Sequence, residues 1–136
     1  MKTTVLPIQA LRPHERVRYM NVLIVLWSVW RTGTFTHPIL VDKESGTILD
    51  GHHRYFACRL LGCSRVPCYV TDYHADTRIT VGSWRPEYVV TKELVTQHAQ
   101  SGKLMPHKTS RHFYPELPST HFSLDSLLLK NDDNRV

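Results

Sequence analysis

The sequence predicts one α/β (or α+β) domain in which a small mixed sheet is flanked by helices. Three observations predict it. The chain has 136 residues, which is the usual size of one domain. Hydrophobic residues make up 41% of the sequence, which is enough to fill one core. Segments with strand patterns and segments with helix patterns follow one another in mixed order, which indicates a mixed class of fold.

The first third of the chain predicts a strand over residues 5–10, a turn over 11–15 and a long helix over 17–31 that ends at Gly33. In this helix, apolar side chains recur at steps of three and four residues, and further apolar side chains fill the other faces. A helix that is apolar nearly all round is either buried or joined to a partner. We expect burial, with a homodimer through residues 17–31 as the alternative.

The middle of the chain predicts a hairpin followed by a helix. Strands over 38–42 and 47–50 flank a turn over 43–46, and a helix over 52–61 begins directly afterwards and ends at Gly62. The next strand is expected over 66–73. Its Pro67 favours an edge position or the start of a strand, because proline cannot donate a backbone hydrogen bond. A short strand is expected over 79–81.

The C-terminal part predicts a helix over 92–100, with Thr91 as its N-cap and Gly102 as its stop. A basic loop over 103–112 follows. We place the boundary of the main domain at residue 115. Residues 116–136 are then a C-terminal extension, partly frayed because its last residues are mostly polar.

Charge and cysteine content narrow the class of protein. The formal net charge of +5 suits an anionic partner, such as nucleotide phosphates or nucleic acid. The three cysteines are odd in number and evenly spaced, which fits neither a closed disulfide set nor a zinc site and predicts reduced, buried thiols. The most apolar run, residues 22–30, is far shorter than the ~20 residues that cross a bilayer. We therefore expect a cytoplasmic protein with no membrane partner.

The strongest functional signal is the run Asp50-Gly51-His52-His53-Arg54, placed where a strand passes into a helix. Free N–H groups and the dipole at a helix N-terminus favour an anion, and glycine lets the backbone approach it closely. The two histidines and the arginine add side-chain donors. An aspartate beside a phosphate site suggests Mg²⁺, which is usually held by carboxylates together with phosphates.

Two weaker signals lie elsewhere in the sequence. Hydroxyl and basic side chains that can bind phosphate or carboxylate oxygens follow one another in the run Lys108-Thr109-Ser110-Arg111-His112. Alone, this run also fits a solvated basic loop. Glu15, at the start of the long predicted helix, is alone most simply a cap or helix-dipole residue.

Taken together, these motifs resemble a known family. The Asp50–Arg54 run, the helix end at Leu61-Gly62, the Val66-Pro67 pair and Asp72-Tyr73 are similar to ParB-like N-terminal domains of the ParB/sulfiredoxin fold. Sulfiredoxin has a cysteine where this chain has Gly51, so its chemistry is not indicated. The double histidine resembles the free serine kinases of this fold, and so do further segments: residues 11–15, 38–42, 84–85, 90–92 and 108–112.

The resemblance implies a catalytic domain over residues 1–115 that transfers a phosphoryl group from ADP or ATP to the hydroxyl of free L-serine. It implies that Glu15 is the catalytic base and that Asp50 is catalytic and holds Mg²⁺. The nucleotide phosphates would contact Gly51, His52, His53 and Arg54. The substrate and phosphate side would be formed by Trp84, Lys108, Thr109, Ser110, Arg111 and His112.

Two other functions remain open from the sequence. The positive charge also fits a ParB-type DNA-binding protein, although too few residues follow position 115 for a helix-turn-helix and nucleic acid is not the expected partner. The apolar helix and the small size fit a non-catalytic regulator that binds a nucleotide or metabolite. No P-loop and no protein-kinase signature occurs in the sequence, so the kinase prediction depends on the resemblance.

Overall fold

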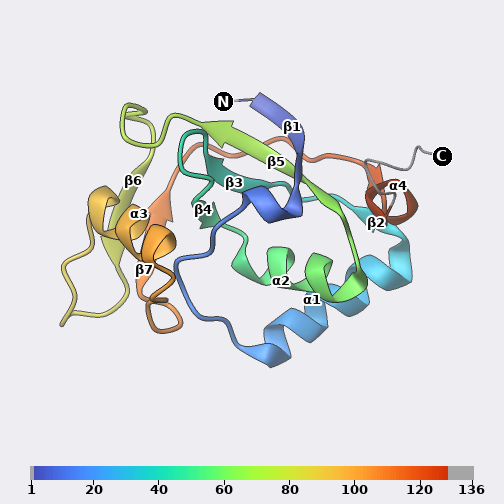
Figure 1. The fold of residues 1–136 in the computed structure, drawn as a ribbon, viewed down its shortest axis with the longest axis horizontal. Coiled ribbons are helices and arrows are strands. Elements are labelled where there is room, and N and C mark those ends of the chain that lie inside the picture. The colour runs from blue at the N-terminus through green and yellow to red at the C-terminus, as the bar shows by residue number, and fades with distance from the viewer. Residues whose placement is uncertain (1, 129–136) are drawn as a thin grey trace.

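The computed structural model describes residues 2–128 and has a four-stranded mixed sheet at its centre. The strand order is β1 (Lys2–Pro7), β5 (Arg65–Thr71), β3 (Ile39–Asp42) and β4 (Ile48–Asp50). β5 pairs parallel with β3, whereas the β1–β5 and β3–β4 pairs are antiparallel. The predicted class, a small mixed sheet flanked by helices, is confirmed (Figure 1).

Both faces of this sheet are covered at its centre, which explains why all four residues of β3 are buried. Ile39 and Val41 face a core cluster formed with α1 (Tyr19–Thr32) and α2 (His52–Leu61), which lie on one side of the sheet in Figure 1. Leu40, between them, faces a second cluster, because successive strand residues point to opposite faces. That second cluster is closed by α3 (Lys92–Ser101) and by the ribbon of β6 (Thr80–Ser83) and β7 (Ser110–Phe113).

The C-terminal part of the described chain returns to the first cluster. β8 (Phe122–Ser123) pairs with β2 (Thr34–Phe35), and α4 (Leu124–Leu128) follows it. Leu124 and Leu127 are buried in the first cluster. The division of the chain at residue 115 stays a prediction, and the polar end that we expected to fray, residues 129–136, lies outside the described residues.

Several predicted elements differ from the structure near the N-terminus. The first strand ends at Pro7 and passes into a short 3₁₀ helix, Ile8–Ala10. Residues 11–16 do not form a turn; they run extended, because Arg12 exchanges backbone hydrogen bonds with Gly46 and Ile48. Further along, Met105 donates to His14 O and accepts from Arg16 N, so α1 begins only at Tyr19.

Two further segments show how the expectations compare with the structure. Of the two positions expected for Pro67, the structure has the one near the start of a strand: β5 is central, but β3 pairs with it only from Cys68 onward. The segment expected to be a basic loop ends as β7, whose residues 110–113 pair with β6. The three cysteines are free and buried, as predicted.

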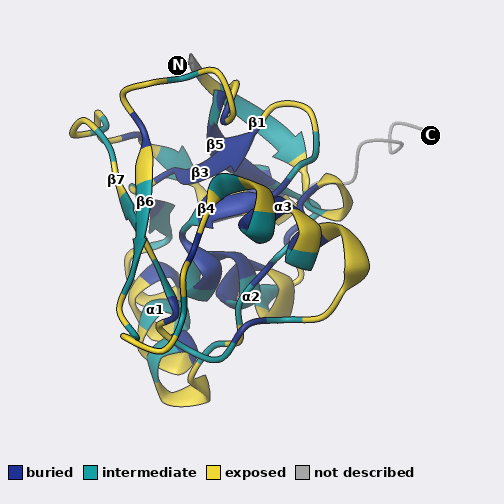
Figure 2. Ribbon diagram, turned by 90° about the vertical axis from the view of Figure 1, so that its left-hand side faces the viewer, coloured by how far each residue is buried: buried dark blue, intermediate teal, exposed yellow. Residues whose placement is uncertain are grey.

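The expected burial of the first long helix was also wrong. Val22 and Val29 of α1 are buried, but the opposite face is apolar and open to solvent (Figure 2). Its six large side chains are each 52–81% exposed: Tyr19, Met20, Leu23, Ile24, Trp27 and Trp30. We call these six residues the α1 face. Among the described residues, no helix is long and apolar enough to cross a membrane.

Candidate active site

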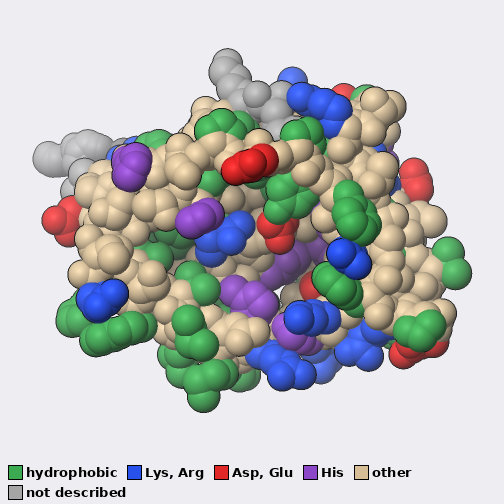
Figure 3. All heavy atoms as spheres, turned by 180° about the vertical axis from the view of Figure 1, so that it is seen from behind, with side chains coloured by type: hydrophobic (Ala, Val, Ile, Leu, Met, Phe, Trp, Pro, Cys, Tyr) green, Lys and Arg blue, Asp and Glu red, His purple; other side chains and the backbone are tan. Residues whose placement is uncertain are grey.

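A cavity of about 510 Å³ opens where α1, the β4–α2 corner and β7 meet. Figure 3 shows this hollow, with histidine side chains along it and lysine and arginine side chains around it. Four lysine and arginine side chains and four histidines line the cavity against two carboxylates, Glu15 and Asp50. This balance of charge suits an anionic ligand.

The β4–α2 corner forms one wall of the cavity. Gly51 has φ +106°, and a Cβ there would lie 2.9 Å from Arg54 Nη2 and 3.2 Å from Ile39 Cγ1, so the turn requires glycine. α2 begins immediately afterwards, and the first N–H groups of a helix have no partner within it. The corner therefore presents free backbone donors at the positive end of the helix dipole.

Three buried nitrogens of residues that line this cavity lack a partner within the part of the chain that the structure describes. They are His53 Nε2, Arg54 Nε and His107 Nε2. The rings of His53 and His107 lie edge to face, with centroids 5.6 Å apart. Buried polar atoms are nearly always hydrogen-bonded, so three such atoms in one cavity indicate a place for a ligand that accepts hydrogen bonds.

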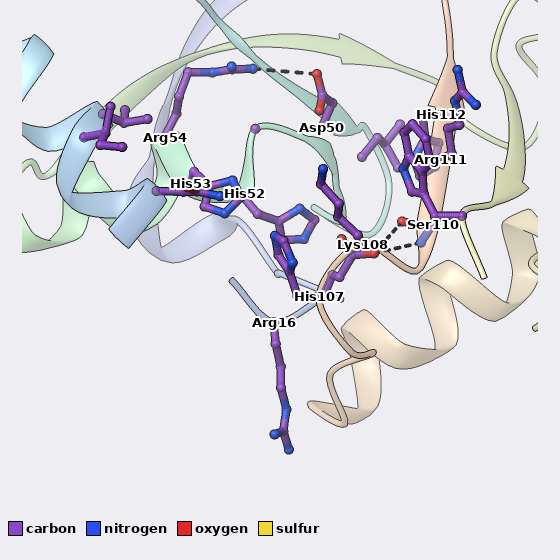
Figure 4. Close-up of a pocket in the computed structure, with 17 residues that line it drawn as sticks. Arg16, Asp50, His52, His53, Arg54, His107, Lys108, Ser110, Arg111 and His112 are labelled. Atoms are coloured by element: carbon purple, nitrogen blue, oxygen red, sulfur yellow. Dashed lines mark hydrogen bonds and ion pairs between the residues drawn. The ribbon is translucent and has the colours of Figure 1, made fainter. Parts of the chain in front are cut away.

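Asp50 lies at the edge of this wall, at the end of β4. Its Oδ2 accepts a hydrogen bond from the hydroxyl of Tyr114. The same oxygen lies 3.8 Å from Arg54 Nη2 (Figure 4). Its other oxygen, Oδ1, takes no hydrogen bond from residues 2–128 of the structure. Within the same range no group of three or more His, Cys, Asp or Glu side chains forms a metal cage. One free carboxylate oxygen is nevertheless what Mg²⁺ needs when phosphates supply its other ligands.

Glu15 faces Asp50 from the opposite wall and is held by β7. Its Oε1 accepts hydrogen bonds from Thr109 N (3.2 Å), Ser110 N (2.8 Å) and Ser110 Oγ (2.9 Å). The two consecutive N–H groups follow Lys108, whose left-handed φ of +54° helps to form a concave carboxylate site. Burial outweighs these hydrogen bonds and raises the pKa of Glu15 above its ordinary value.

Glu15 lines the cavity, and a backbone hydrogen bond from Lys108 adds to those that favour its ionised form. A carboxylate that is held in place through one oxygen and borders a cavity has the arrangement of a general base. Its raised pKa increases its proton affinity.

A network of neutral histidines supports the floor of the cavity. Burial lowers the pKa of His14 to about 3 and that of His112 to about 4. His112 Nε2 lies 2.8 Å from the hydroxyl of Tyr73, and His52 Nε2 accepts a hydrogen bond from His14 N. These side chains are fixed by hydrogen bonds and carry no charge at physiological pH, so the positive charge of the cavity comes from its lysine and arginine residues.

Trp84 lies at the rim and is 50% exposed. The guanidinium carbon of Arg111 is 4.1 Å from the centre of its ring, and Lys108 Nζ is 5.8 Å from it. Trp84 thus supports two cations that border the cavity.

Comparisons with known proteins show which sequences this chain resembles. No protein-family model matches the chain. A ParB-like protein of Sulfolobus acidocaldarius is 39% identical over 74 residues, which are 54% of this chain and 36% of that protein. An ADP-dependent L-serine kinase of Thermococcus kodakarensis is 33% identical over 82 residues, 57% of this chain and 34% of the kinase. The chain therefore matches only about a third of the length of these relatives.

Among solved structures, a free serine kinase in complex with AMP superimposes with a TM-score of 0.83 at 18% identity, covering 92% of this chain and 93% of that one. The protein has the fold of the free serine kinases. The resemblance to ParB-like proteins and serine kinases predicted from the sequence is thus confirmed.

Within this serine kinase fold, the predicted site residues lie together with one exception. Thr109 is fully buried, and its hydroxyl donates to Pro106 O, so only its backbone N–H serves the site. The remaining predicted residues line the cavity: Glu15, Asp50, Gly51, His52, His53, Arg54, Trp84, Lys108, Ser110, Arg111 and His112. Their individual roles stay predictions.

The sequence alone missed several residues of the site. His107 was present in the predicted basic loop but was not singled out, although histidine beside Lys108 was a usable signal. Arg16, Asn21, Ile24 and Val25 line the cavity only because residues 11–16 run extended and turn α1 toward it. Tyr114, the partner of Asp50, gave no sequence signal.

Proposed function

We propose that the protein is a free amino-acid kinase that transfers a phosphoryl group from ADP or ATP to the hydroxyl of L-serine and gives O-phospho-L-serine. One observation carries the proposal: the carboxylate of Glu15, held through Oε1, lines a cavity whose other wall is the N-terminus of α2, beside buried nitrogens that have no partner among residues 2–128. The named activity of the Thermococcus relative and the nucleotide in the structural neighbour support it.

The β4–α2 wall would bind the nucleotide phosphates. The free N–H groups of α2, His53 Nε2 and Arg54 Nε offer donors from the corner, and His107 Nε2 offers one from the facing loop. Lys108 and Arg111 border the same space. Phosphoryl transfer requires mainly positioning and neutralisation of charge, and this wall supplies both.

The Glu15 wall would bind the acceptor. Oε2 of Glu15 takes the proton of the serine hydroxyl as the hydroxyl oxygen bonds to phosphorus and the nucleotide leaves. Ser110 N and Thr109 N hold the carboxylate in place during this step. Trp84 and the cations stacked on it would border the amino acid.

Mg²⁺ would be held by Asp50, through the oxygen that Tyr114 leaves free, together with phosphate oxygens of the nucleotide. When bound, the ion neutralises phosphate charge and fixes the phosphates in one geometry. Arg54, 3.8 Å from Asp50, neutralises charge on the same side of the cavity.

Nucleotide binding is expected to take up protons. Burial and nearby cations lower the pKa of both His53 and His107, and His107 lowers that of His53 further, so both are mainly neutral at pH 7 without ligand. A bound phosphate raises both pKa values, and binding is then tightest at low pH and weakens as pH rises through the bound-state values. Calorimetric titration of ADP at pH 7 in buffers of different ionisation enthalpy should show proton uptake. Unchanged proton balance in His53→Gln would contradict this assignment.

One screen identifies both the amino acid that accepts the phosphoryl group and the nucleotide that donates it. Purified protein is incubated with Mg²⁺, either ADP or ATP, and an equimolar mixture of L-serine, L-threonine and L-homoserine, and the products are identified by mass spectrometry. We expect O-phosphoserine as the main product with one of the two nucleotides. A different phosphoamino acid as the main product would contradict the assignment of the acceptor.

We also propose that the α1 face pairs with the same face of a second copy. By the size of such side chains it presents an area on the order of 800 Å², similar to one side of a standard interface and larger than most exposed patches of monomers. None of its six side chains is charged, and Trp27 and Trp30 stack on each other with ring centroids 5.6 Å apart. A two-fold axis would bring this uncharged surface against itself.

The double substitution Leu23→Glu with Trp27→Glu should convert a dimer into a monomer, because it places like charges in an apolar interface. Sedimentation velocity measures the change. Val89→Glu is the matched control, since Val89 is 84% exposed but lies outside α1. A wild-type protein that remains monomeric at about 100 µM would contradict the self-association and would direct attention to another occupant of the face.

A further inference from the structure

Behind Glu15 lies a buried chain of hydrogen-bonded groups in which one hydroxyl hydrogen stands between two acceptor atoms. It begins at His14, which is fully buried. His14 Nδ1 lies 2.7 Å from Ile48 O, and a carbonyl oxygen only accepts, so Nδ1 carries the hydrogen. Because burial keeps the imidazole neutral, its other nitrogen, Nε2, is a bare acceptor.

Ser110 stands between this acceptor and the carboxylate. Its Oγ lies 2.8 Å from His14 Nε2 and 2.9 Å from Glu15 Oε1. A hydroxyl has one hydrogen to donate. When Glu15 is ionised, both neighbours only accept, and the hydroxyl can donate to only one of them. The hydrogen goes to the carboxylate, because hydrogen bonds to a charged group are the stronger ones.

We propose that the hydroxyl of Ser110 is a two-position switch, which donates to Glu15 Oε1 while Glu15 is ionised and turns to His14 Nε2 when Glu15 takes up a proton. In the protonated state Oε1 keeps the N–H groups of Thr109 and Ser110, so losing the hydroxyl leaves it hydrogen-bonded. His14 then gains the donor that it lacked.

This switch deepens the role of the base, and in that respect it rests on the proposed kinase function. The proton that leaves the acceptor hydroxyl goes to Glu15, and the only other change is the rotation of one O–H bond. The Ser110–His14 hydrogen bond stabilises the protonated form, in which Glu15 would stand after transfer. Ser110 and His14 are therefore positioning residues and not catalytic ones.

Several other charged or titratable side chains lie around the Glu15–Ser110–His14 hydrogen bonds. Lys108 and Arg16 line the same cavity as Glu15. His112 and His98 lower the pKa of His14, and His52 accepts from the backbone of His14 through its own Nε2. The ring centroids of His52 and His112 lie 4.6 and 6.0 Å from that of His14.

Two variants should shift the pKa of Glu15 in opposite directions. Ser110→Ala removes the donor to the carboxylate and should raise it. His14→Asn keeps a side-chain amide that can donate to Ile48 O but removes the acceptor that the protonated form uses, and should lower it. Each shift should be about half to one pKa unit, the size of one net hydrogen bond. If Ser110 and His14 served only in packing, there would be no reason for the two variants to shift the pKa of Glu15 in opposite directions.

The switch is read directly by nitrogen NMR of His14 in ligand-free protein, with the carboxyl carbon of Glu15 followed in the same samples. As Glu15 titrates, the Nε2 resonance of His14 should move upfield on protonation, because it gains a hydrogen bond. Glu15→Gln should hold the resonance at the hydrogen-bonded position at every pH, and Ser110→Ala should hold it at the free position. Amide spectra confirm that each variant is folded.

A stationary His14 Nε2 resonance through the wild-type titration of Glu15, or shifts of the same sign in the two variants, would overturn the proposal. The samples contain no nucleotide or amino acid. The switch can therefore fail in a working kinase, and it can be present in a protein that transfers no phosphoryl group.

Discussion

Glu15→Gln should lower turnover by about 10³-fold, within the range for a lost general base, and should change nucleotide affinity less than about threefold. Glutamine can still accept from Thr109 N and Ser110 N at the Oε1 position, so the wall keeps its shape. It replaces Oε2 by an amide group that cannot take a proton. Turnover is measured with saturating nucleotide and L-serine, and affinity by calorimetry.

The pH profile separates loss of the base from a general defect. Because burial raises the pKa of Glu15, wild-type kcat/KM should rise with pH through a value above 4.5, and this acid limb should disappear in the glutamine variant. Arg16→Gln is a useful control, since Arg16 borders the same cavity but makes none of the hydrogen bonds to Oε1. Equal losses of turnover and nucleotide affinity in Glu15→Gln would contradict its assignment as the base.

Asp50→Asn should lower turnover at least about 100-fold, because a direct ligand of Mg²⁺ is expected to matter more than the outer residues whose loss costs 10- to 100-fold. Asparagine preserves the size of the side chain but removes the charge that would hold the ion between Asp50 and the phosphates. Part of the loss should be recovered at high Mg²⁺ concentration. The measurement is initial rate against free Mg²⁺ for both proteins.

Tyr114→Phe is the matched control for Asp50. It removes the hydrogen bond to Oδ2 and leaves the carboxylate and its free oxygen in place. We expect less than a tenfold loss, near the size of one hydrogen bond to a charged group. If Tyr114→Phe were as damaging as Asp50→Asn, the aspartate would serve to hold Tyr114 and not to hold Mg²⁺.

The β4–α2 wall of the site was predictable from sequence because its chemistry is local. Asp50, Gly51 and the residues after them are neighbours in sequence, and the turn that joins them requires a glycine with positive φ. Strand and helix patterns on either side place that turn at a helix N-terminus. The same reasoning gave the hairpin of β3 and β4 and the caps of α3, whose Thr91 accepts from Leu94 N.

The Glu15 wall was not predictable in the same way, because its contacts join distant parts of the chain. Ser110 donates to Glu15 across 95 residues, and Tyr114 donates to Asp50 across 64. The run from Lys108 was expected to bind phosphate or carboxylate oxygens, and the carboxylate that it binds is that of Glu15. The exposed α1 face was missed because an apolar helix pattern does not say which face the domain leaves uncovered.

The central claim is phosphoryl transfer to free serine, and phosphorus NMR tests it most directly. The protein is mixed with Mg²⁺, L-serine and either ADP or ATP, and spectra are recorded over time beside the Glu15→Gln variant. The account predicts a phosphomonoester signal that grows with loss of the nucleotide's terminal phosphate, with AMP or ADP as co-product, and only slowly in the variant. No such signal with either nucleotide, in samples where calorimetry shows that the nucleotide binds, would contradict it and identify a nucleotide-binding protein without kinase activity.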